Sequence, residues 1–422
     1  MMETFIHEFV SNLNRNCNQI FKDNKTRSRL ETLVANLEGS DEYKSVAFAS
    51  GQAATFTLLF TLKPKRIFKR MKPHDKEFAK HFKEGEDAVG YSGTSDAIGL
   101  LRSFSKHYSG ILKRQVRKSM QSEEVSSKTI EKELDNEDFM LEILDLDEIE
   151  KETLDENKSN GLFSGTLIWL ETPVNPTCDL EDIEYYSKKA KQMGALVIVD
   201  STFASPALQQ PLKWGADFAL HSATKFMGGH SDLLGGMVTG KSNGLISNVK
   251  SNRSVMGGVM GNLEAYLLMR SLRTLNVRVD YQSQSAEIVA NWLQSQIGND
   301  ETRAKVTKVH YPKLQSIDSQ TSTEESETSE KKLTNYEICQ KQMNGKGPGI
   351  LSFELSNPEE ARKLPKLLNI IENATSLGGV ESSIDYRFQW DRFSPPALLR
   401  LSIGLESPKD IITDLKTALL KL

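Results

Sequence analysis

Asp200 and Lys225 are the residues whose types and spacing most directly suggest chemistry. Asp200 ends the apolar run Ala195–Val199, and Lys225 follows 25 positions later at the end of the segment His221–Lys225, which carries two small hydroxyl side chains. A lysine amine can form a Schiff base, and a carboxylate can hold a pyridinium nitrogen protonated. The pair therefore matches the needs of pyridoxal 5'-phosphate (PLP), although a helix-capping aspartate and a solvated loop lysine would give the same pattern.

The elements expected around this pair alternate between strands and helices. Short apolar runs end at Ser50, Leu170, Asp200 and Leu220, and helical segments are expected over 52–60 and 180–193. Such alternation predicts an α/β fold in which helices cover both faces of a mostly parallel sheet. Ligands of such sheets bind outside the carboxyl ends of the strands. We therefore expect Gly51, Asn175, Asp200 and Lys225 to lie at one rim, with the backbone N–H groups after Gly51 facing a phosphate.

Composition limits the class of protein. The chain has 422 residues, 38% hydrophobic residues and a formal net charge of -4, which does not favour a nucleic-acid partner. It has no apolar run of 18 residues and no secretory signal pattern, so no membrane partner and a cytoplasmic location are expected. Its three cysteines have no metal-ligand spacing, which predicts reduced thiols and no metal site. The basic pairs Lys65-Arg66 and Lys69-Arg70 leave a nuclear location as an alternative.

Three segments differ in composition from the rest and are expected to be insertions. Residues 64–83 are basic and contain two prolines, which predicts a solvated loop and a surface helix. Residues 114–160 are basic at first and then acidic, and residues 315–333 are rich in Ser, Thr and Glu, which favours disorder. We interpret all three as additions to a common core.

Six segments resemble, in chain order, the motifs of the Cys/Met-metabolism PLP enzymes, the trans-sulfuration family of cystathionine γ-lyases, γ-synthases and β-lyases. They are Ala49–Ala54, Glu171–Thr177, Val199–Pro206, His221–Asp232, Ser376–Ser382 and Leu399–Gly404. The resemblance implies a fold-type I, aminotransferase-like PLP domain at 23–272, a smaller C-terminal α+β domain at 273–422 and a shortened N-terminal arm at 1–22. It also implies a homo-oligomer, a dimer or a tetramer, that acts on an amino-acid substrate.

The resemblance also assigns roles to the residues near the cofactor. Lys225 would bind PLP covalently and move the substrate Cα proton, Asp200 would pair with the pyridinium nitrogen, and Tyr91 would stack on the ring and assist the leaving group. The phosphate would be held by the backbone of Gly51 and Gln52 and by the hydroxyls of Ser222 and Thr224. A turn tyrosine facing solvent is the alternative interpretation of Tyr91.

Arg400 is the predicted anchor of the substrate carboxylate. Apolar residues alternate along Leu399–Leu405, so Arg400 is expected on the face of a strand opposite to the core. A guanidinium there can grip a carboxylate with two hydrogen bonds, although a surface arginine would show the same pattern. The resemblance adds Asn175 and Ser376 as residues that orient this carboxylate.

Two positions depart from the family pattern. Gln19–Phe21 stand where the family carries a Tyr-x-Arg pair for the phosphate of the neighbouring subunit, and Thr375 replaces a glutamate of the γ-specific enzymes. The sequence therefore predicts a PLP-dependent carbon-sulfur lyase or γ-replacement transferase, with cystathionine or an acylated homoserine as substrate. Cystathionine γ-lyase or γ-synthase activity is favoured, with β-elimination as one alternative and a catalytically impaired regulatory homologue as another.

Overall fold

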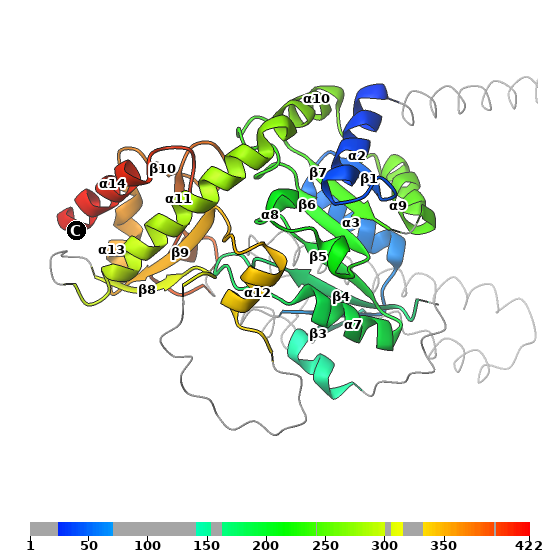
Figure 1. Ribbon diagram of the computed structural model, residues 1–422, viewed down its shortest axis with the longest axis horizontal. Helices are drawn as coiled ribbons and strands as arrows, with labels where there is room; N and C mark the ends of the chain where they lie inside the picture. The colour runs from blue at the N-terminus through cyan, green and yellow to red at the C-terminus, as the bar shows by residue number, and fades with distance from the viewer. Residues whose placement is uncertain are drawn as a thin grey trace, which may run out of the picture.

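The structure, a computed structural model, describes residues 24–70, 141–152, 163–241, 243–299, 305–314, 332–391 and 394–422. Two β-sheets, each with its own helices, form the described part of the chain (Figure 1). The strands are β1 (Lys44–Phe48), β2 (Arg66–Lys69), β3 (Glu142–Asp145), β4 (Thr166–Glu171), β5 (Leu196–Asp200), β6 (Phe218–Ser222), β7 (Gly236–Gly240), β8 (Val306–His310), β9 (Ile350–Leu355), β10 (Glu372–Asn373), β11 (Ser383–Tyr386) and β12 (Leu398–Ser402). The α-helices are α2 (Lys25–Leu37), α3 (Gly51–Leu62), α7 (Ile183–Met193), α8 (Ser205–Leu208), α9 (Asn243–Met256), α10 (Asn262–Ser271), α11 (Leu275–Ser295), α12 (Asn335–Gln342), α13 (Pro358–Lys363) and α14 (Pro408–Lys421).

The larger sheet has seven strands in the order β1-β7-β6-β5-β4-β2-β3. Strands β3, β2, β4, β5 and β6 run parallel, and β7 runs antiparallel to both of its neighbours. The central strands are almost continuously apolar, as expected for a parallel sheet that is buried on both faces. This confirms the predicted fold class and brings the carboxyl ends of β4, β5 and β6 to one edge.

Helices cover both faces of the larger sheet. On one face, Leu58 and Leu59 of α3 and Val249 of α9 share a buried apolar cluster with strand residues such as Val238. On the other face, α7 packs Ile183 and other apolar residues against side chains of β4 and β5. The helix expected over 180–193 begins later, at Ile183, because the Asp182 side chain accepts a hydrogen bond from Tyr185 N and caps it there.

The smaller, C-terminal sheet has five strands in the order β10-β11-β12-β9-β8 and is mostly antiparallel. Apolar residues of α11, α13 and α14 pack against it in one buried cluster. Figure 1 shows α11 running from α10, beside the larger sheet, to the smaller sheet. Because α11 contributes to the cores of both parts, the proposed domain boundary near residue 272 stays a prediction.

Residues 64–83 and 114–160 are predicted to be insertions. This prediction is wrong for residues 66–69 and 142–151, which belong to the fold. Residues Arg66–Lys69 form β2, which lies inside the larger sheet between β3 and β4, and its Ile67 and Phe68 are fully buried. Strand β3 and the following 3₁₀-helix Leu146–Lys151 also belong to the fold. Strand β2 has only four residues, and just two of them, Ile67 and Phe68, are apolar. A run this short among basic residues does not show the pattern of a strand in the sequence.

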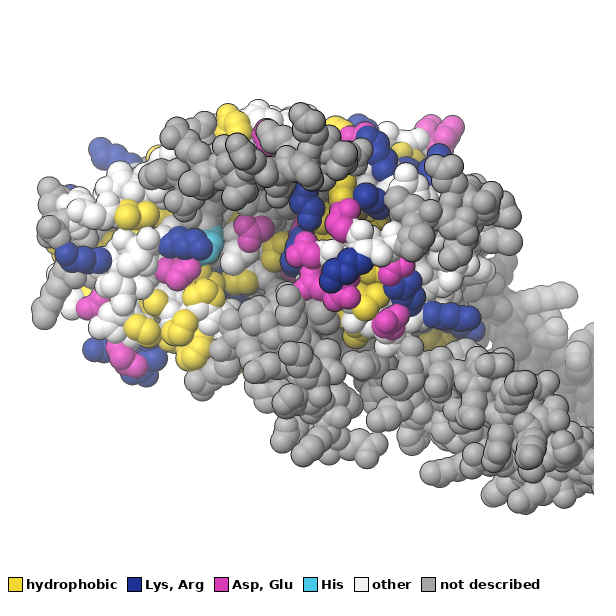
Figure 2. All heavy atoms as spheres, turned by 90° about the horizontal axis from the view of Figure 1, so that it is seen from below, with side chains coloured by type: hydrophobic (Ala, Val, Ile, Leu, Met, Phe, Trp, Pro, Cys, Tyr) yellow, Lys and Arg dark blue, Asp and Glu magenta, His cyan; other side chains and the backbone are white. Residues whose placement is uncertain are grey.

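The basic residues at 65–70 do not form a continuous exposed patch, and the compartment of the protein stays a prediction. Arg66 forms ion pairs with Glu142 and Glu152, and Arg70 forms ion pairs with Asp147 and Glu181. Figure 2 shows acidic and basic side chains intermingled on the face seen from below. Of the helices in the described ranges, none is long and apolar enough to cross a membrane.

Candidate active site at the carboxyl edge of the larger sheet

Asp200 lies at the carboxyl end of β5, as the sequence predicts. It pairs in register with Glu171 at the end of β4, and its Oδ1 accepts hydrogen bonds from Thr202 N at 3.1 Å and Thr202 Oγ1 at 2.6 Å. Burial raises the pKa of Asp200 to about 6, the Glu171 carboxylate adds to the rise, and the Thr202 hydrogen bonds oppose it. A cationic nitrogen next to Asp200 would reverse this shift and keep the carboxylate ionised.

Lys225 lies in the turn that follows β6. The turn is fixed by hydrogen bonds from Lys225 N to Ser222 O at 3.1 Å and from Gly229 N to Lys225 O at 2.7 Å. Burial lowers the pKa of Lys225 to about 8, and the positive charge of Arg400 contributes to the shift. A larger fraction of this amine is therefore neutral near pH 7 than for an exposed lysine, which makes it the better nucleophile and base.

Helix α3 begins at Gly51, close to Ser222 at the end of β6. Ser50 caps the helix by accepting a hydrogen bond from Ala53 N, and neither Gly51 N nor Gln52 N has an acceptor within the described ranges. A Cβ atom at Gly51 would lie 3.1 Å from Ser222 Oγ, so glycine allows the helix start to approach Ser222 closely. Backbone N–H groups beside a hydroxyl suit a phosphate.

Thr224 and Ser222 differ in their surroundings. The Thr224 hydroxyl accepts a hydrogen bond from Gly235 N at 3.1 Å and lies 3.4 Å from Gly235 O, so it is already engaged. Ser222 N donates to Thr202 Oγ1 at 2.9 Å, which links the Ser222 strand end to the Asp200 carboxylate. The assignment of both hydroxyls to the cofactor phosphate stays a prediction.

Arg400 lies on β12 and is nearly completely buried, at 3% exposure, so the alternative of a surface arginine is wrong. Its Nη1 donates to Asn175 Oδ1 at 3.0 Å, and its Nη2 donates to the carbonyl of Thr375 at 2.7 Å. Asn175 belongs to the loop after β4, so this bond joins the smaller sheet to the carboxyl edge of the larger one. The backbone of Ser376 is held by a hydrogen bond from Ser383 Oγ to Ser376 O at 2.9 Å.

These residues fit pyridoxal 5'-phosphate on three observations. The Asp200 Oδ2 atom has no hydrogen-bond partner among the described residues, a helix start with unpaired N–H groups lies beside Ser222, and the Lys225 amine has a lowered pKa. The Asp200 carboxylate suits the ring nitrogen of PLP, the helix start suits its phosphate, and the Lys225 amine suits its aldehyde. Tyr91 and the segment Gln19–Phe21 lie outside the described residues.

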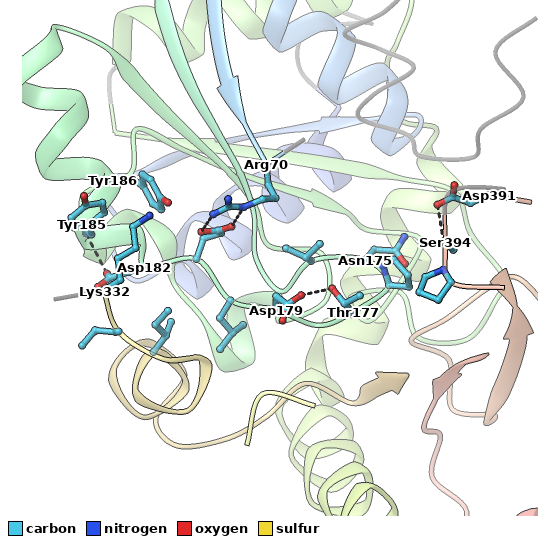
Figure 3. A pocket seen from close by; sticks show the side chains of 17 residues that line it. Arg70, Asn175, Thr177, Asp179, Asp182, Tyr185, Tyr186, Lys332, Asp391 and Ser394 are labelled. Carbon is cyan, nitrogen blue, oxygen red and sulfur yellow. Dashed lines mark hydrogen bonds and ion pairs between the residues drawn. The ribbon is translucent and has the colours of Figure 1, made fainter. Parts of the chain in front are cut away.

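A cavity of about 580 Å³ is lined in part by the loop after β4. Figure 3 shows Asn175, Asp391 and Ser394 at one end of it and Tyr185 and Lys332 at the other. Neither Lys225 nor Asp200 is among its described lining residues. Among the described residues that line the cavity, Asn175 is the one that belongs to the candidate site.

Several residues of the site were missed by sequence reasoning. Thr202 holds Asp200, Glu171 raises its pKa, and Asp385 on β11 forms an ion pair with Arg400 at 3.3 Å. Thr202 follows Asp200 by two positions, so an acid-x-Thr pattern after a strand could have indicated it. Asp385 lies opposite Arg400 only because β11 and β12 pair in one register, and the sequence does not state that register.

Comparisons with known proteins agree with this geometry. Residues 125–420 match the model of a family described as Cys/Met metabolism PLP-dependent enzyme. The chain is 36% identical to a cystathionine β-lyase of Lactococcus lactis over 286 residues, 65% of this chain and 69% of that relative. It is 37% identical to a cystathionine γ-synthase of Mycobacterium bovis over 262 residues, 60% of this chain and 61% of that relative.

Solved structures extend the similarity to the whole fold. The crystal structure of a cystathionine γ-lyase from Lactobacillus plantarum, complexed with L-serine, superposes with a TM-score of 0.66 and 28% identity. The superposition covers 94% of this chain and 86% of that one. The apo structure of a methionine γ-lyase from Micromonospora echinospora gives the same TM-score, identity and coverage.

Proposed function

Because the chain belongs to the Cys/Met-metabolism PLP-dependent enzymes, we propose that it is a trans-sulfuration enzyme that eliminates or replaces a β or γ substituent of an amino acid. Cystathionine and acylated homoserines are the proposed substrates. The observation that carries the proposal is the placement of Arg400, bonded to Asn175, close enough to Lys225 for its charge to lower the pKa of the lysine. An amino acid held by its carboxylate at Arg400 would have its Cα near the lysine amine.

Each residue of the site has a distinct proposed task. Bound PLP supplies an electron-withdrawing ring that stabilises negative charge at the substrate Cα. Lys225, with its pKa lowered to about 8, accepts and returns the Cα proton, and Asp200 provides the negative charge that holds the ring nitrogen protonated. Arg400 and Asn175 fix the carboxylate, so that the Cα–H bond points at the lysine. Tyr91 is proposed to donate a proton to the leaving group.

The position of the bond that is broken is the finer part of the proposal. We propose γ-elimination or γ-replacement first and β-elimination second, since similar proteins include enzymes named for both. The Thr375 carbonyl is bonded to Arg400, while its side chain is exposed and carries no charge. An uncharged side chain at this position does not favour one bond over the other.

Product analysis after incubation with cystathionine tests the proposal. Purified protein loaded with PLP is expected to release cysteine and 2-oxobutyrate if it cleaves at the γ carbon, and homocysteine and pyruvate if it cleaves at the β carbon. Cystathionine formed from an acylated homoserine and cysteine would identify a synthase. A chain that turns over neither substrate would contradict the proposal and favour the catalytically impaired homologue.

We further propose that the protein is a homo-oligomer in the cytoplasm. Exposed apolar side chains on α10 and α11, among them Leu263, Tyr266 and Val277, support an interface between copies of the chain. Cys178 and Cys339 are free thiols in the structure, which suits a reducing compartment. Light scattering of the purified protein measures its mass, and imaging of a tagged chain shows its location.

A further inference from the structure

We propose that Asp385 and Arg387 are positioning residues that set the orientation and the net charge of the Arg400 site, and that the site thereby requires an anionic group on its substrate. The proposal deepens the proposed function, since it rests on Arg400 as the carboxylate anchor. It concerns two residues that lie outside the sequence motifs described above. They act on the substrate through Arg400.

The three side chains form one buried ion network. Asp385 lies on β11 directly opposite Arg400 on β12, and Arg387 follows at the end of β11. The Asp385 Oδ2 atom accepts from Arg387 Nη1 at 2.8 Å and from Arg400 Nη2 at 3.3 Å. The side chains of Arg387, Asp385 and Arg400 are 6%, 1% and 3% exposed, so water does not screen their charges.

Charge counting explains why two arginines share one aspartate. A buried pair of Asp385 and Arg400 alone would be neutral and would offer a carboxylate only weak attraction. Arg387 returns one positive charge to this buried group. Buried uncompensated charge is costly, and Arg387 Nε has no hydrogen-bond partner within the described part of the chain. An anion bound at Arg400 would lower that cost, which gives the site a preference for anionic ligands.

Hydrogen bonding explains the orientation. A guanidinium has five N–H groups. Asn175, the Thr375 carbonyl and Asp385 accept three hydrogen bonds from Arg400. Two N–H groups remain, one on Nη1 and one on Nε, and each can donate a hydrogen bond to an anionic ligand. Burial lowers the pKa of Arg400 to about 10, with Arg387 contributing to the shift and Asp385 opposing it, so Arg400 stays charged at neutral pH.

Charge-changing variants of the PLP-loaded enzyme test the proposal. Arg387→Gln leaves Asp385 to neutralise Arg400, so we expect KM for the amino-acid substrate to rise roughly tenfold while kcat changes less than about threefold. Arg387→Lys keeps the charge and is expected to retain a KM close to that of the unchanged enzyme. Glycine has no leaving group, so its binding can be measured by calorimetry without turnover. Its affinity is expected to fall in Arg387→Gln and to stay close to that of the unchanged enzyme in Arg387→Lys.

The double variant Asp385→Asn with Arg387→Gln decides between charge and packing. It removes one negative and one positive charge and so restores the single positive charge of Arg400. We expect its KM to return to within about threefold of the unchanged enzyme. A double variant that binds no better than Arg387→Gln alone would mean that Arg387 has only a structural role, and the proposal would be overturned. Thermal unfolding of each variant verifies that the protein is folded.

Arg400→Gln separates this proposal from the proposed function. A large rise in KM for Arg400→Gln, together with an unchanged KM for Arg387→Gln, would overturn the role of Arg387 alone. An unchanged KM for Arg400→Gln would overturn the carboxylate anchor, and the role of Arg387 would fall with it. A rise in KM in both single variants, followed by recovery in the double variant, supports both.

Discussion

Thr202 provides the hydrogen bonds that hold the Asp200 carboxylate. Thr202 Oγ1 donates to Asp200 Oδ1 at 2.6 Å and accepts from Ser222 N at 2.9 Å, so it ties the ends of β5 and β6 together. Burial and Glu171 push the pKa of Asp200 upward, and Thr202 opposes them. At the scale of single residues, opposing effects therefore set the pKa of Asp200, whereas burial and the charge of Arg400 both lower the pKa of Lys225.

Replacing Thr202 is expected to weaken the hold on the cofactor. Thr202→Val removes the hydroxyl at nearly constant volume, so the pKa of Asp200 rises further and less of it is ionised near neutral pH. We expect PLP affinity and kcat each to fall about tenfold, measured by equilibrium dialysis and steady-state kinetics. Thr202→Ser keeps the hydroxyl and is the matched control. Equal behaviour of the two variants would contradict this account.

The lowered pKa of Lys225 predicts a pH dependence for cofactor uptake. The neutral amine is the nucleophile, and with a pKa of about 8 its fraction grows as pH rises from 6 toward 9. The rate at which cofactor-free protein gains the absorbance of bound PLP should rise through this range, reach half of its maximum near pH 8 and level off above about pH 9. The absorbance that Lys225→Ala gains measures PLP bound without a covalent bond, and this amount is subtracted. A lysine with its ordinary pKa would give a rate still rising about tenfold per pH unit at pH 9.

At the scale of elements, α11 connects the lysine turn to the substrate-binding segments. Arg278 donates to the carbonyls of Phe226, at 2.9 Å, and Met227, at 3.4 Å, which directly follow Lys225. One helical turn later, Gln282 Nε2 donates to Gly379 O at 2.7 Å and to Ile403 O at 2.9 Å. Residues four apart lie on one helix face, so a single rigid helix sets the separation of Lys225 and Arg400.

Arg278→Met is expected to destabilise the protein by about 2–3 kcal/mol. The change leaves the carbonyls of Phe226 and Met227 buried without these donors, and each buried unsatisfied group costs about 1–3 kcal/mol. Arg273 is exposed on the preceding 3₁₀-helix Leu272–Thr274, so Arg273→Met is the matched control with a change within about 0.5 kcal/mol. Urea denaturation measures both. Similar values for the two variants would show that Arg278 does not hold the lysine turn.

At the scale of the whole molecule, local patterns predicted much of the fold, while contacts distant in sequence were less predictable. Asp200 and Lys225 could be found because one ends a strand and the other lies in the turn after a strand, and the rule that parallel strands end at one edge predicted where they would lie. The bond between Asn175 and Arg400 spans 225 positions, and the motif resemblance indicated both residues without their contact. Strand β2 and Asp385 could not be predicted, because strand pairing, and not local composition, defines their positions.

The proposed oligomer can be tested on the exposed face of α10. Leu263 and Tyr266 are 65% and 54% exposed and lie three positions apart, on one side of the helix. Changing both to Glu is expected to lower the mass measured by light scattering, because charge opposes burial of this surface. Ile370→Glu, at an exposed apolar residue of the C-terminal domain, is the control. A protein that is monomeric before any change would contradict the proposal.

Lys225, in the turn after β6, is the residue that we propose to hold the cofactor covalently. Reduction of the PLP-loaded protein with borohydride, followed by peptide mass spectrometry, fixes the cofactor on whichever lysine it occupies. The account predicts a pyridoxyl group on Lys225 and its loss in Lys225→Ala, together with loss of the absorbance band at ~420 nm. A label on another lysine, or a band that persists in Lys225→Ala, would contradict it.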